Sequence, residues 1–432
     1  MEKTAEMRKE LQCHIHPLNA LGTYKYVVVC SRYEGKWLLS RHRKRETWET
    51  QGGHIEAGET PMEAARRELF EESGVKDADI YPVCDYYGYD PRSHSNGMVF
   101  FAEVHHLGRM PESEMQEIRL FDVLPENLTY PNVTPRLFAE AERLRVSGIL
   151  AQMGYAGAEA EPFRNAEDGS NYEVWKVALD GKVCVLKKAK GRELAVYETF
   201  FREAVPGAPR LLKTAGDYFL MEYAAGEDLC RCTREKLTKA LDALIALQDR
   251  YWAYEEAQTF MDSLPGRENR GRYLKDPELE GAYAGYLSLY RSLPRTLCHD
   301  DLLPFNVLIA EEGATIIDWE TAGILPYPTS LARLIAHGAE EEDAFFYLKE
   351  ADRAFAIDYY YENLVKNKGI TYEDYRHALD YFLLYEYCEW IMLGNRYPDA
   401  DMGRYRQYLA KAREHLRAMK QEDADVVSFK TN

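Results

Sequence analysis

The sequence predicts two domains, the first of the α/β class and the second of the α+β class. Its 432 residues are too many for one ordinary hydrophobic core. Strand and helix patterns alternate over 1–150, and a stretch of small and polar residues, 151–163, is predicted to be a linker. The remainder, 164–432, divides into a strand-rich part (164–226) and a long helical part (227–432).

The composition is that of a globular protein, 46% hydrophobic and 29% charged. The net charge of −18 argues against a nucleic-acid partner, which requires clustered Lys and Arg. No apolar run reaches the ~18 residues of a membrane span, and the charged N-terminus shows no signal peptide. The eight cysteines form no metal or disulfide pattern. We therefore expect a cytoplasmic protein without a nucleic-acid or membrane partner, and its oligomeric state stays open.

In the first third, YKYVVVC (24–30) and KWLLSRH (36–42) predict two strands joined by a turn. A helical pattern covers 61–73, and MVFFAEV (98–104) predicts another strand. A second helical pattern begins at 134 and is expected to end near Gly148.

The second domain is expected to open with a hairpin over 172–188 that turns at Asp180–Gly181. A helix and a strand follow, at 192–203 and 218–224. From about residue 232 helical periodicity predominates. One strand-rich stretch, 307–318, interrupts it.

The helix over 61–73 carries its own start and stop signals. Thr60 is placed to cap its N-terminus, and Glu63 stands where the capping-box partner belongs. Pro61 suits the first turn, and Gly74 is placed to end the helix. Glu63 is therefore interpreted as structural.

Glu68, Glu71 and Glu72 share an arc of about 100° on this helix. Like charges at these spacings repel one another, and acids near a helix C-terminus oppose its dipole. A bound divalent cation would remove both penalties, and carboxylate ligands suit Mg²⁺. The alternative is an acidic face exposed to solvent.

The spacing of Gly53, Glu59 and the run RELFEESGV (67–75) matches the Nudix box, so the first third resembles Nudix hydrolases. The resemblance implies an α/β/α sandwich that cleaves nucleoside diphosphates linked to a further group. It implies that Mg²⁺ is held by Glu68, Glu71 and Glu72. It also implies that Glu59 assists, that Arg67 orients the carboxylates, and that the catalytic residues are Glu59, Glu68 and Glu72.

Two residues before the box bear on the substrate. Gln51 stands where many Nudix relatives carry Pro, which leaves the choice of substrate open. Trp48 is either a ring that stacks on a base or a core aromatic.

A second group of polar residues lies in LCHDDLLPFNVLI (297–309) and in the IDWETAG that follows. His299, Asp301 and Asn306 fit the pattern H-x-D-x-x-x-x-N, and Asp318 ends an apolar strand. Asp301 keeps the five-residue step to Asn306 and is assigned the role of base. Its neighbour Asp300 is assigned a loop or capping role.

Residues upstream fall in the order that phosphoryl transfer needs. Lys187 ends the strand VCVLK, where it can reach the phosphates of a nucleotide. Glu193 opens the next helix and can pair with that lysine, and Glu198 is its competitor. The strand end MEYAAG offers the backbone of Glu222 and Ala224 to an adenine ring.

Residues 160–432 thus resemble the aminoglycoside phosphotransferase and choline kinase family, and IDWETAG is most like the choline kinases. The resemblance implies a bilobal protein-kinase-like fold that transfers a phosphate from ATP, or another nucleoside triphosphate, to a hydroxyl group. It implies that Asp301 is the catalytic base, that Asn306 and Asp318 bind Mg²⁺, and that His299 shapes the loop.

The sequence departs from this family in two places. The turn expected to cover the phosphates, AEDGSNYEVW (166–175), has one glycine and no GxGxxG. Ser330 stands where many relatives carry an Asp after the metal-binding aspartate.

The acceptor of the phosphate is predicted to contact a further set of side chains. Tyr385, Glu386, Glu389 and Trp390 recur at helical spacings, where they either surround an ammonium group or form core. Trp319 and Glu320, beside Asp318, are better placed to line an acceptor pocket.

We expect a bifunctional enzyme whose partners are nucleotides and small molecules. A Mg²⁺-dependent Nudix hydrolase is joined to an ATP-dependent kinase of a small, cationic alcohol such as an amino alcohol or aminoglycoside. In the alternative, one half is catalytic and the other is a nucleotide-sensing or scaffolding module. A protein kinase is disfavoured, because DFG, APE and a Gly-rich loop are absent from the sequence.

Overall fold

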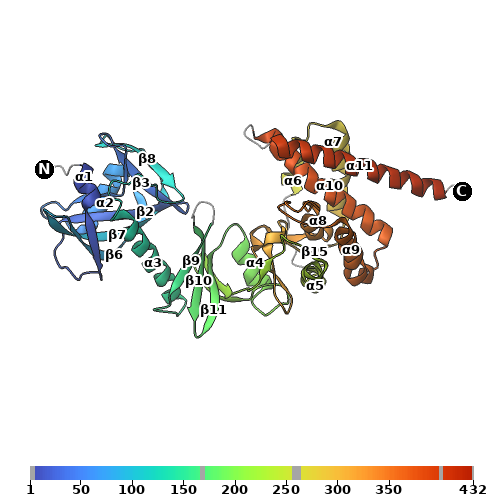
Figure 1. Ribbon diagram of the computed structural model, residues 1–432, viewed down its shortest axis with the longest axis horizontal. Coiled ribbons are helices and arrows are strands. Elements are labelled where there is room, and N and C mark those ends of the chain that lie inside the picture. The colour runs from blue at the N-terminus through green and yellow to red at the C-terminus, as the bar shows by residue number, and fades with distance from the viewer. Residues whose placement is uncertain (1–4, 166–170, 255–263, 398–401, 431–432) are drawn as a thin grey trace. The chain divides into compact units, whose positions relative to one another are not determined.

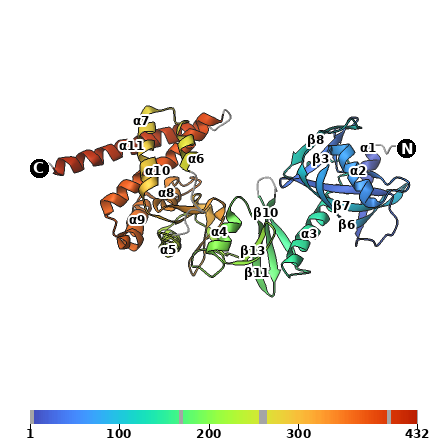
Figure 2. The same ribbon diagram turned by 180° about the vertical axis from the view of Figure 1, so that it is seen from behind.

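The structure is a computed structural model that describes residues 5–165, 171–254, 264–397 and 402–430 (Figures 1 and 2). The chain divides into two compact units, Met1–Lys188 with Thr214–Tyr218, and Ala189–Lys213 with Phe219–Asn432. A strand-rich N-terminal region precedes a helical C-terminal region, which confirms the predicted fold class. The predicted domain limits at 150 and 164 fall within the first unit and stay a prediction.

The first unit contains an eight-stranded mixed sheet and three helices. The helices are α1 (Ala5–Glu10), α2 (Pro61–Ser73) and α3 (Thr134–Gln152). The strands are β1 (Gln12–His16), β2 (Tyr26–Tyr33), β3 (Lys36–His42), β4 (Trp48–Glu49), β5 (Gln51–His54), β6 (Asp77–Tyr89), β7 (His94–His106) and β8 (Met115–Phe121). Their order is β1-β6-β7-β2-β3-β4, with β5 paired to β2 and β8 paired to β3. Only β2 and β7 run parallel among these pairs.

Helices α2 and α3 cover opposite faces of this sheet (Figure 1). Successive residues of a strand face opposite sides, so β2 contributes to two cores. Val27 and Val29 pack in the core that contains Leu69 of α2. Cys30 packs in the core that contains Phe138 of α3. The result is the α/β/α sandwich that the Nudix resemblance implies.

Three antiparallel strands complete the first unit: β9 (Ala160–Arg164), β10 (Asn171–Leu179) and β11 (Lys182–Lys188). The predicted hairpin is confirmed, and Asp180 and Gly181 both have positive φ, 48° and 77°, as a type I′ turn requires. The first half of the predicted phosphate-covering turn, 166–170, lies outside the described residues.

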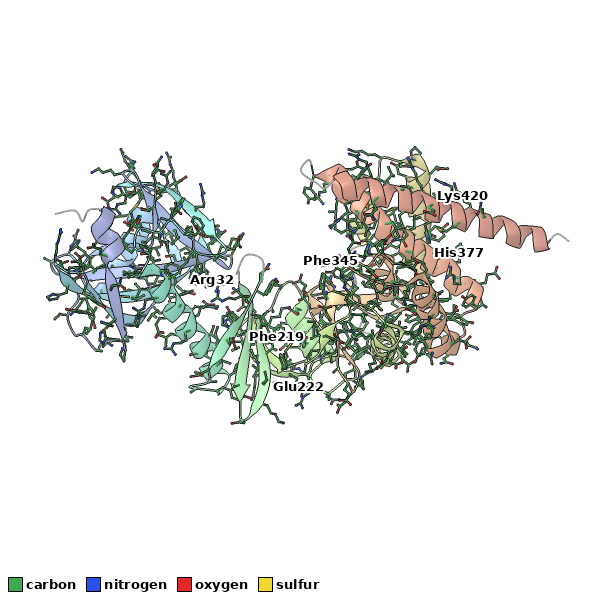
Figure 3. All side chains as sticks on the ribbon, in the orientation of Figure 1. Arg32, Phe219, Glu222, Phe345, His377 and Lys420 are labelled. Atoms are coloured by element: carbon green, nitrogen blue, oxygen red, sulfur yellow. The ribbon has the colours of Figure 1, made fainter. Side chains whose placement is uncertain are left out.

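Buried charged side chains join this hairpin to the sandwich, among them Arg32, which Figure 3 labels. Arg32 Nη2 of β2 lies 2.9 Å from Glu173 Oε1 of β10, and the Arg32 side chain is 4% exposed. Arg145 of α3 pairs with Glu142 at 2.8 Å, and its guanidinium lies 5.3 Å from the ring centroid of Trp175. The sandwich and the hairpin therefore share one buried polar network.

The second unit is largely helical. Its helices are α4 (Glu193–Phe200), α5 (Arg234–Arg250), α6 (Leu264–Gly271), α7 (Pro277–Ser292), α8 (Pro328–Ala336), α9 (Glu350–Tyr360), α10 (Tyr372–Arg396) and α11 (Met402–Lys430). Short strands lie between them: β14 (Glu227–Asp228), β15 (Arg295–Cys298), β16 (Val307–Ile309), β17 (Ala314–Ile316) and β18 (Gly323–Pro326). Strands β12 (Leu211–Ala215) and β13 (Tyr218–Glu222) each belong in part to the first unit and in part to the second. Strands β16 and β17 confirm the predicted strand-rich stretch.

One helix end differs from the prediction. Helix α3 continues through Gly148 to Gln152, because Gly148 is exposed and Leu150 extends the buried face of the helix. Burial of that leucine outweighs the modest helix penalty of one glycine. None of the helices in the described ranges combines the length and the apolar character that crossing a membrane requires.

Candidate active sites

Helix α2 carries the acids of the first site, and local signals fix its ends. Glu63 N–H donates to Thr60 Oγ1 at 3.3 Å, and Thr60 N–H donates to Glu63 Oε2 at 2.8 Å. The predicted capping box is therefore confirmed. Gly74, with φ of 79°, ends the helix as predicted.

Arg67 lies at the centre of these acids. Its Nε donates to Glu59 Oε1 at 2.9 Å, and its Nη1 donates to Glu68 Oε1 at 2.8 Å. The same Nη1 lies 3.2 Å from Glu71 Oε2. The hydrogen bond from Arg67 lowers the pKa of Glu59. Arg67 thus joins three of the four acids predicted for this site.

The fourth acid, Glu72, lies against strand β5. Its Oε2 accepts a hydrogen bond from the backbone N–H of Gly52 at 2.8 Å, and its side chain is buried. The next residue, Gly53, lies against Glu68. A Cβ at position 53 would lie 2.2 Å from Glu68 Oε1, so only glycine leaves room for that carboxylate where it stands.

Crowding and burial make this site unfavourable for negative charge. Burial raises the pKa of Glu68 and raises that of Glu72 well above its usual range, and neighbouring acids add to both shifts. Glu114, just before β8, acts on both carboxyls, and Glu49 acts on Glu72. Sequence reasoning missed Glu49 and Glu114, because both lie outside the box and only the folded sheet brings them near.

A cavity of about 490 Å³ borders Gly52, Gly53 and Glu72, and Glu49 and Glu114 line it too. Its wall also carries basic side chains, those of Arg8, Lys25 and Arg45. Buried carboxylates beside cations fit a divalent ion together with the phosphates of a nucleotide.

The carboxylates of the predicted metal ligands Glu68, Glu71 and Glu72 do not converge on one point in this structure. Within the described ranges, no three His, Cys, Asp or Glu side chains are arranged to hold a metal ion. Arg67 binds Glu68 and Glu71 in this arrangement, so a metal ion would have to take its place at those carboxylates.

The residues before the box have structural contacts. Gln51 is buried, and its Nε2 donates to Ser40 Oγ at 2.8 Å. Trp48 is buried in the core that also contains Leu39, with its ring centroid 5.0 Å from that of Phe121. These contacts favour the core alternative for Trp48.

In the second site, His299 holds the loop that follows β15. Its Nε2 lies 3.0 Å from the carbonyl oxygen of Ile317, and its Nδ1 accepts from the backbone N–H of Asp301 at 3.3 Å. Burial lowers the pKa of His299, which suits a neutral ring with one donating and one accepting nitrogen. Ser330 Oγ accepts from His299 N–H at 2.9 Å, so this serine supports the loop where many relatives carry an Asp.

Asn306 and Asp318 lie on neighbouring segments of this site. Asn306 Nδ2 donates to the carbonyl oxygen of Asp301 at 2.9 Å, and Ile317 N–H donates to the carbonyl oxygen of Asn306 at 3.0 Å. Asp318 follows in the left-handed conformation, with φ of 65°. An amide oxygen and a carboxylate brought together in this way fit Mg²⁺ as donors.

The two adjacent aspartates have different partners. Asp300 pairs at 2.7 Å with Arg267, whose side chain is fully buried. Asp301 pairs at 2.6 Å with Arg333 of α8 and is 38% exposed. The structural role assigned to Asp300 agrees with its contact, while the role of Asp301 as base stays a prediction.

The predicted nucleotide-binding residues are placed as follows. Lys187 is buried at the end of β11 in the first unit, and Glu193 is buried at the start of α4 in the second, so their pairing stays a prediction. Burial, then the charges of Glu193 and Asp318, raise the pKa of Tyr197 far above its usual range. These two acids therefore lie near one hydroxyl.

Glu222 lies at the end of β13 (Figure 3). Its backbone N–H already donates to the carbonyl oxygen of Arg210 at 3.0 Å, and its carboxylate pairs with the Arg210 side chain. Ala224 follows in an irregular, half-buried segment. Contact of either residue with adenine stays a prediction.

The predicted acceptor residues on α10 surround the chain's own arginines. The ring of Tyr385 stacks on Tyr286 at 4.6 Å, and the Arg267 guanidinium lies 4.9 Å from its centroid. Glu389 pairs with Arg333 and Arg270. Sequence reasoning missed these arginines, because nothing near them in the sequence marks them.

The other predicted acceptor residues are more scattered. Trp390 stacks on Tyr408 at 5.7 Å. Trp319 is buried against His299, and Glu320 lies 4.0 Å from Lys190. Their roles at an acceptor stay predictions.

Comparisons with known proteins match two separate parts of the chain to two families. The NUDIX domain family matches residues 23–134, and the phosphotransferase enzyme family (APH) matches residues 164–363. YtkD of Bacillus subtilis strain 168, provisionally named an 8-oxo-dGTP diphosphatase, is 34% identical over 106 residues, 24% of this chain and 66% of that protein.

An RNA pyrophosphohydrolase of Yersinia enterocolitica is 41% identical over 54 residues, 12% of this chain and 30% of that protein. The chain thus spans about two thirds of the first relative and less than a third of the second. The solved ethanolamine kinase of Plasmodium vivax is 12% identical, with a TM-score of 0.47, over 66% of this chain and 91% of that one.

The two family matches confirm the predicted enzyme classes, hydrolase and phosphotransferase. The chain therefore carries a NUDIX domain followed by a domain of the phosphotransferase enzyme family.

Proposed function

We propose that the chain is a bifunctional enzyme. Its NUDIX domain hydrolyses a nucleoside diphosphate linked to a further group, with Mg²⁺. Its second domain transfers the γ-phosphate of ATP to a hydroxyl group of a small molecule. The predicted division, with domains 1–150 and 164–432, belongs to this proposal.

The fit of Glu68 against Gly53 is the observation that carries the hydrolase proposal. Gly53 has no room for a Cβ because the carboxylate of Glu68 lies against it. Glu72 is buried and lines the cavity, whose wall also carries basic side chains. Mg²⁺ held by Glu68, Glu71 and Glu72 would polarise the diphosphate and acidify the attacking water. The activities for which the relatives are named favour a nucleoside triphosphate such as 8-oxo-dGTP, or an RNA, as substrate. The net charge of −18 favours the nucleotide.

The His299 loop supports the phosphotransferase proposal. Its hydrogen bonds hold Asp301 and Asn306 on one short segment, with Asp318 on the next. Asp301 would take the proton of the acceptor hydroxyl. The acceptor oxygen bonds to the γ-phosphorus as the bond to the β–γ bridging oxygen breaks, which releases ADP. Family resemblance suggests an amino alcohol or an aminoglycoside as the acceptor.

A matched pair of substitutions tests both activities in the full chain with Mg²⁺. Glu72→Gln is expected to abolish hydrolysis across a panel of nucleoside triphosphates and to leave ATP-dependent phosphorylation intact. Asp301→Asn is expected to do the reverse. If neither activity responds to its own substitution across a broad panel, the proposal of two active sites is wrong.

A second candidate function is that the NUDIX domain binds a nucleotide without cleaving it. The observation that favours it is Arg67, which neutralises Glu68 and Glu71 in place of a metal ion. Calorimetric titration of the full chain with nucleotides and Mg²⁺, followed by analysis of the products, separates the two. Saturable binding without any hydrolysis product would favour the sensing module.

A further inference from the structure

Arg333 of α8 grips the predicted base of the phosphotransferase site by one oxygen only. Its Nη2 and Nε both donate to Asp301 Oδ1, at 2.6 and 3.1 Å. No hydrogen bond from the described part of the chain reaches Oδ2, and the Asp301 side chain is 38% exposed. One carboxylate oxygen is thus fixed while the other stays open to an incoming group.

The other side of the same guanidinium is anchored to α10. Arg333 Nη1 donates to Glu386 Oε2 and to Glu389 Oε2, both at 2.8 Å. Glu386 is only 2% exposed, and its Oε2 also lies 3.3 Å from His337 Nε2. Burial alone would raise the pKa of Glu386, but Arg333 and His337 outweigh it and lower that pKa.

This geometry uses the planar, forked shape of the guanidinium group. All three nitrogens of the Arg333 guanidinium are engaged, one edge with Asp301 and the opposite nitrogen with α10. A lysine offers a single point charge and cannot span both groups. The hydrogen bonds to Glu386 and Glu389 of α10 fix the Arg333 guanidinium in place. Because the same group binds Asp301, it also fixes the position of that carboxylate.

We propose that Arg333 is a positioning residue for phosphoryl transfer, and this rests on the proposed role of Asp301 as base. By fixing Oδ1, Arg333 directs Oδ2 toward the acceptor hydroxyl. Oδ2 takes the hydroxyl proton, the acceptor oxygen bonds to the γ-phosphorus, and ADP leaves with the bridging oxygen. Arg333 itself touches neither the nucleotide nor the acceptor.

The test follows ADP formation by the full chain from MgATP, with ethanolamine, choline or an aminoglycoside supplied as the acceptor. Arg333→Ala is expected to lower kcat by about 100-fold, as small misplacement of a reacting group does. The KM for ATP should change by less than about threefold, since no nucleotide contact is lost. Added guanidinium ion should restore part of kcat, and Arg333→Lys should retain part of it.

Arg353 offers a matched control. Its side chain is 12% exposed, against 13% for Arg333, but it donates to the carbonyl oxygens of Ile335, in the last turn of α8, and of Gly338, just after that helix. Arg353→Ala should change the melting temperature without a comparable loss of kcat and without any response to guanidinium.

Arg333→Ala leaves Glu386 buried without its arginine, which can prevent folding. The double variant Arg333→Met with Glu386→Gln removes that charge, and Glu389 keeps Arg270. It is expected to fold, which circular dichroism checks, and to show the same loss of kcat in the assay of ADP formation. A folded variant that keeps kcat, or a folded Arg333→Ala variant that guanidinium does not rescue, overturns this inference alone. A wild type that forms no ADP overturns the proposed function, and this inference falls with it.

Discussion

The backbone N–H of Gly52 donates to Glu72 Oε2 at 2.8 Å, which joins strand β5 to the C-terminal end of helix α2. Glu72→Gln keeps an oxygen for this N–H and removes the charge. We therefore expect an intact fold and a fall in nucleotide hydrolysis of about 100-fold or more, measured as kcat on nucleoside triphosphates. Glu63→Gln is the control on the same helix, since Gln also serves in a capping box. Equal losses in both variants would contradict a special role for Glu72.

Substitution of the two glycines of β5 by alanine should affect stability and hydrolysis differently. At position 53 a Cβ meets the end of a side chain, Glu68, which can turn away. At position 52 it meets the backbone oxygen of Val27 at 2.4 Å, which cannot. Gly53→Ala should reduce hydrolysis with a nearly unchanged melting temperature, whereas Gly52→Ala should lower that temperature. Reversal of this order would show that the carboxylate of Glu68 is not displaced.

Asp300 and Asp301 should separate stability from catalysis. Asp300→Asn removes the ionic partner of Arg267, whose side chain is fully buried, and is expected to cost about 3–5 kcal/mol of stability. Asp301→Asn keeps an oxygen for Arg333 and should fold, but should lose about 100-fold or more in phosphotransfer. Denaturant unfolding and ADP formation measure the two effects. A stable but inactive Asp300→Asn would exchange the two roles.

Local signals explain what the sequence could predict. Thr60, Glu63 and Gly74 are neighbours along the chain, so a cap and a helix end can be read from their order alone. Glu114 beside Glu72, and Arg333 beside Asp301, are brought together only by the folded sheet and by helix packing. No short-range pattern marks such partners. The sequence therefore predicts the motif residues of each site but not the residues that contact them from other elements.

Helix ends and aromatic residues likewise depend on contacts that the local sequence does not show. Gly148 reads as a stop signal, but the burial of Leu150 outweighs it. The aromatic spacing around Tyr385 predicts either a cage or core, and only the position of Arg267 over the ring shows what the cage already contains. Periodicity gives the face of a helix, not the side chain that will face it.

The buried network of the first unit should be stabilising. Arg145→Met removes the arginine that does most to lower the pKa of Glu142 against its burial, and leaves Glu142 with the longer pair to Arg32 at 3.4 Å. We expect a loss of about 3 kcal/mol in the unfolding of this unit. Arg143→Met on the same helix is the control: this side chain is 59% exposed, and its pair with Glu140 should contribute less than about 1 kcal/mol. Similar losses in the two variants would argue against the network.

Lys411 of α11 should make stability depend on pH. Burial, then the charge of Arg353, lowers its pKa to about 8, below the ordinary value of about 10.4. Between these values the unfolded chain holds the proton that the folded chain has lost, so stability rises with pH. Lys411→Met removes this penalty but also the hydrogen bond to the carbonyl oxygen of Ala336. Its melting temperature relative to wild type should therefore be highest near pH 7 and fall as the pH rises to 10. Lys420→Met, an exposed position on the same helix (Figure 3), should show no such trend. A pH-independent difference for Lys411→Met would place the protonated lysine in the folded state throughout this range.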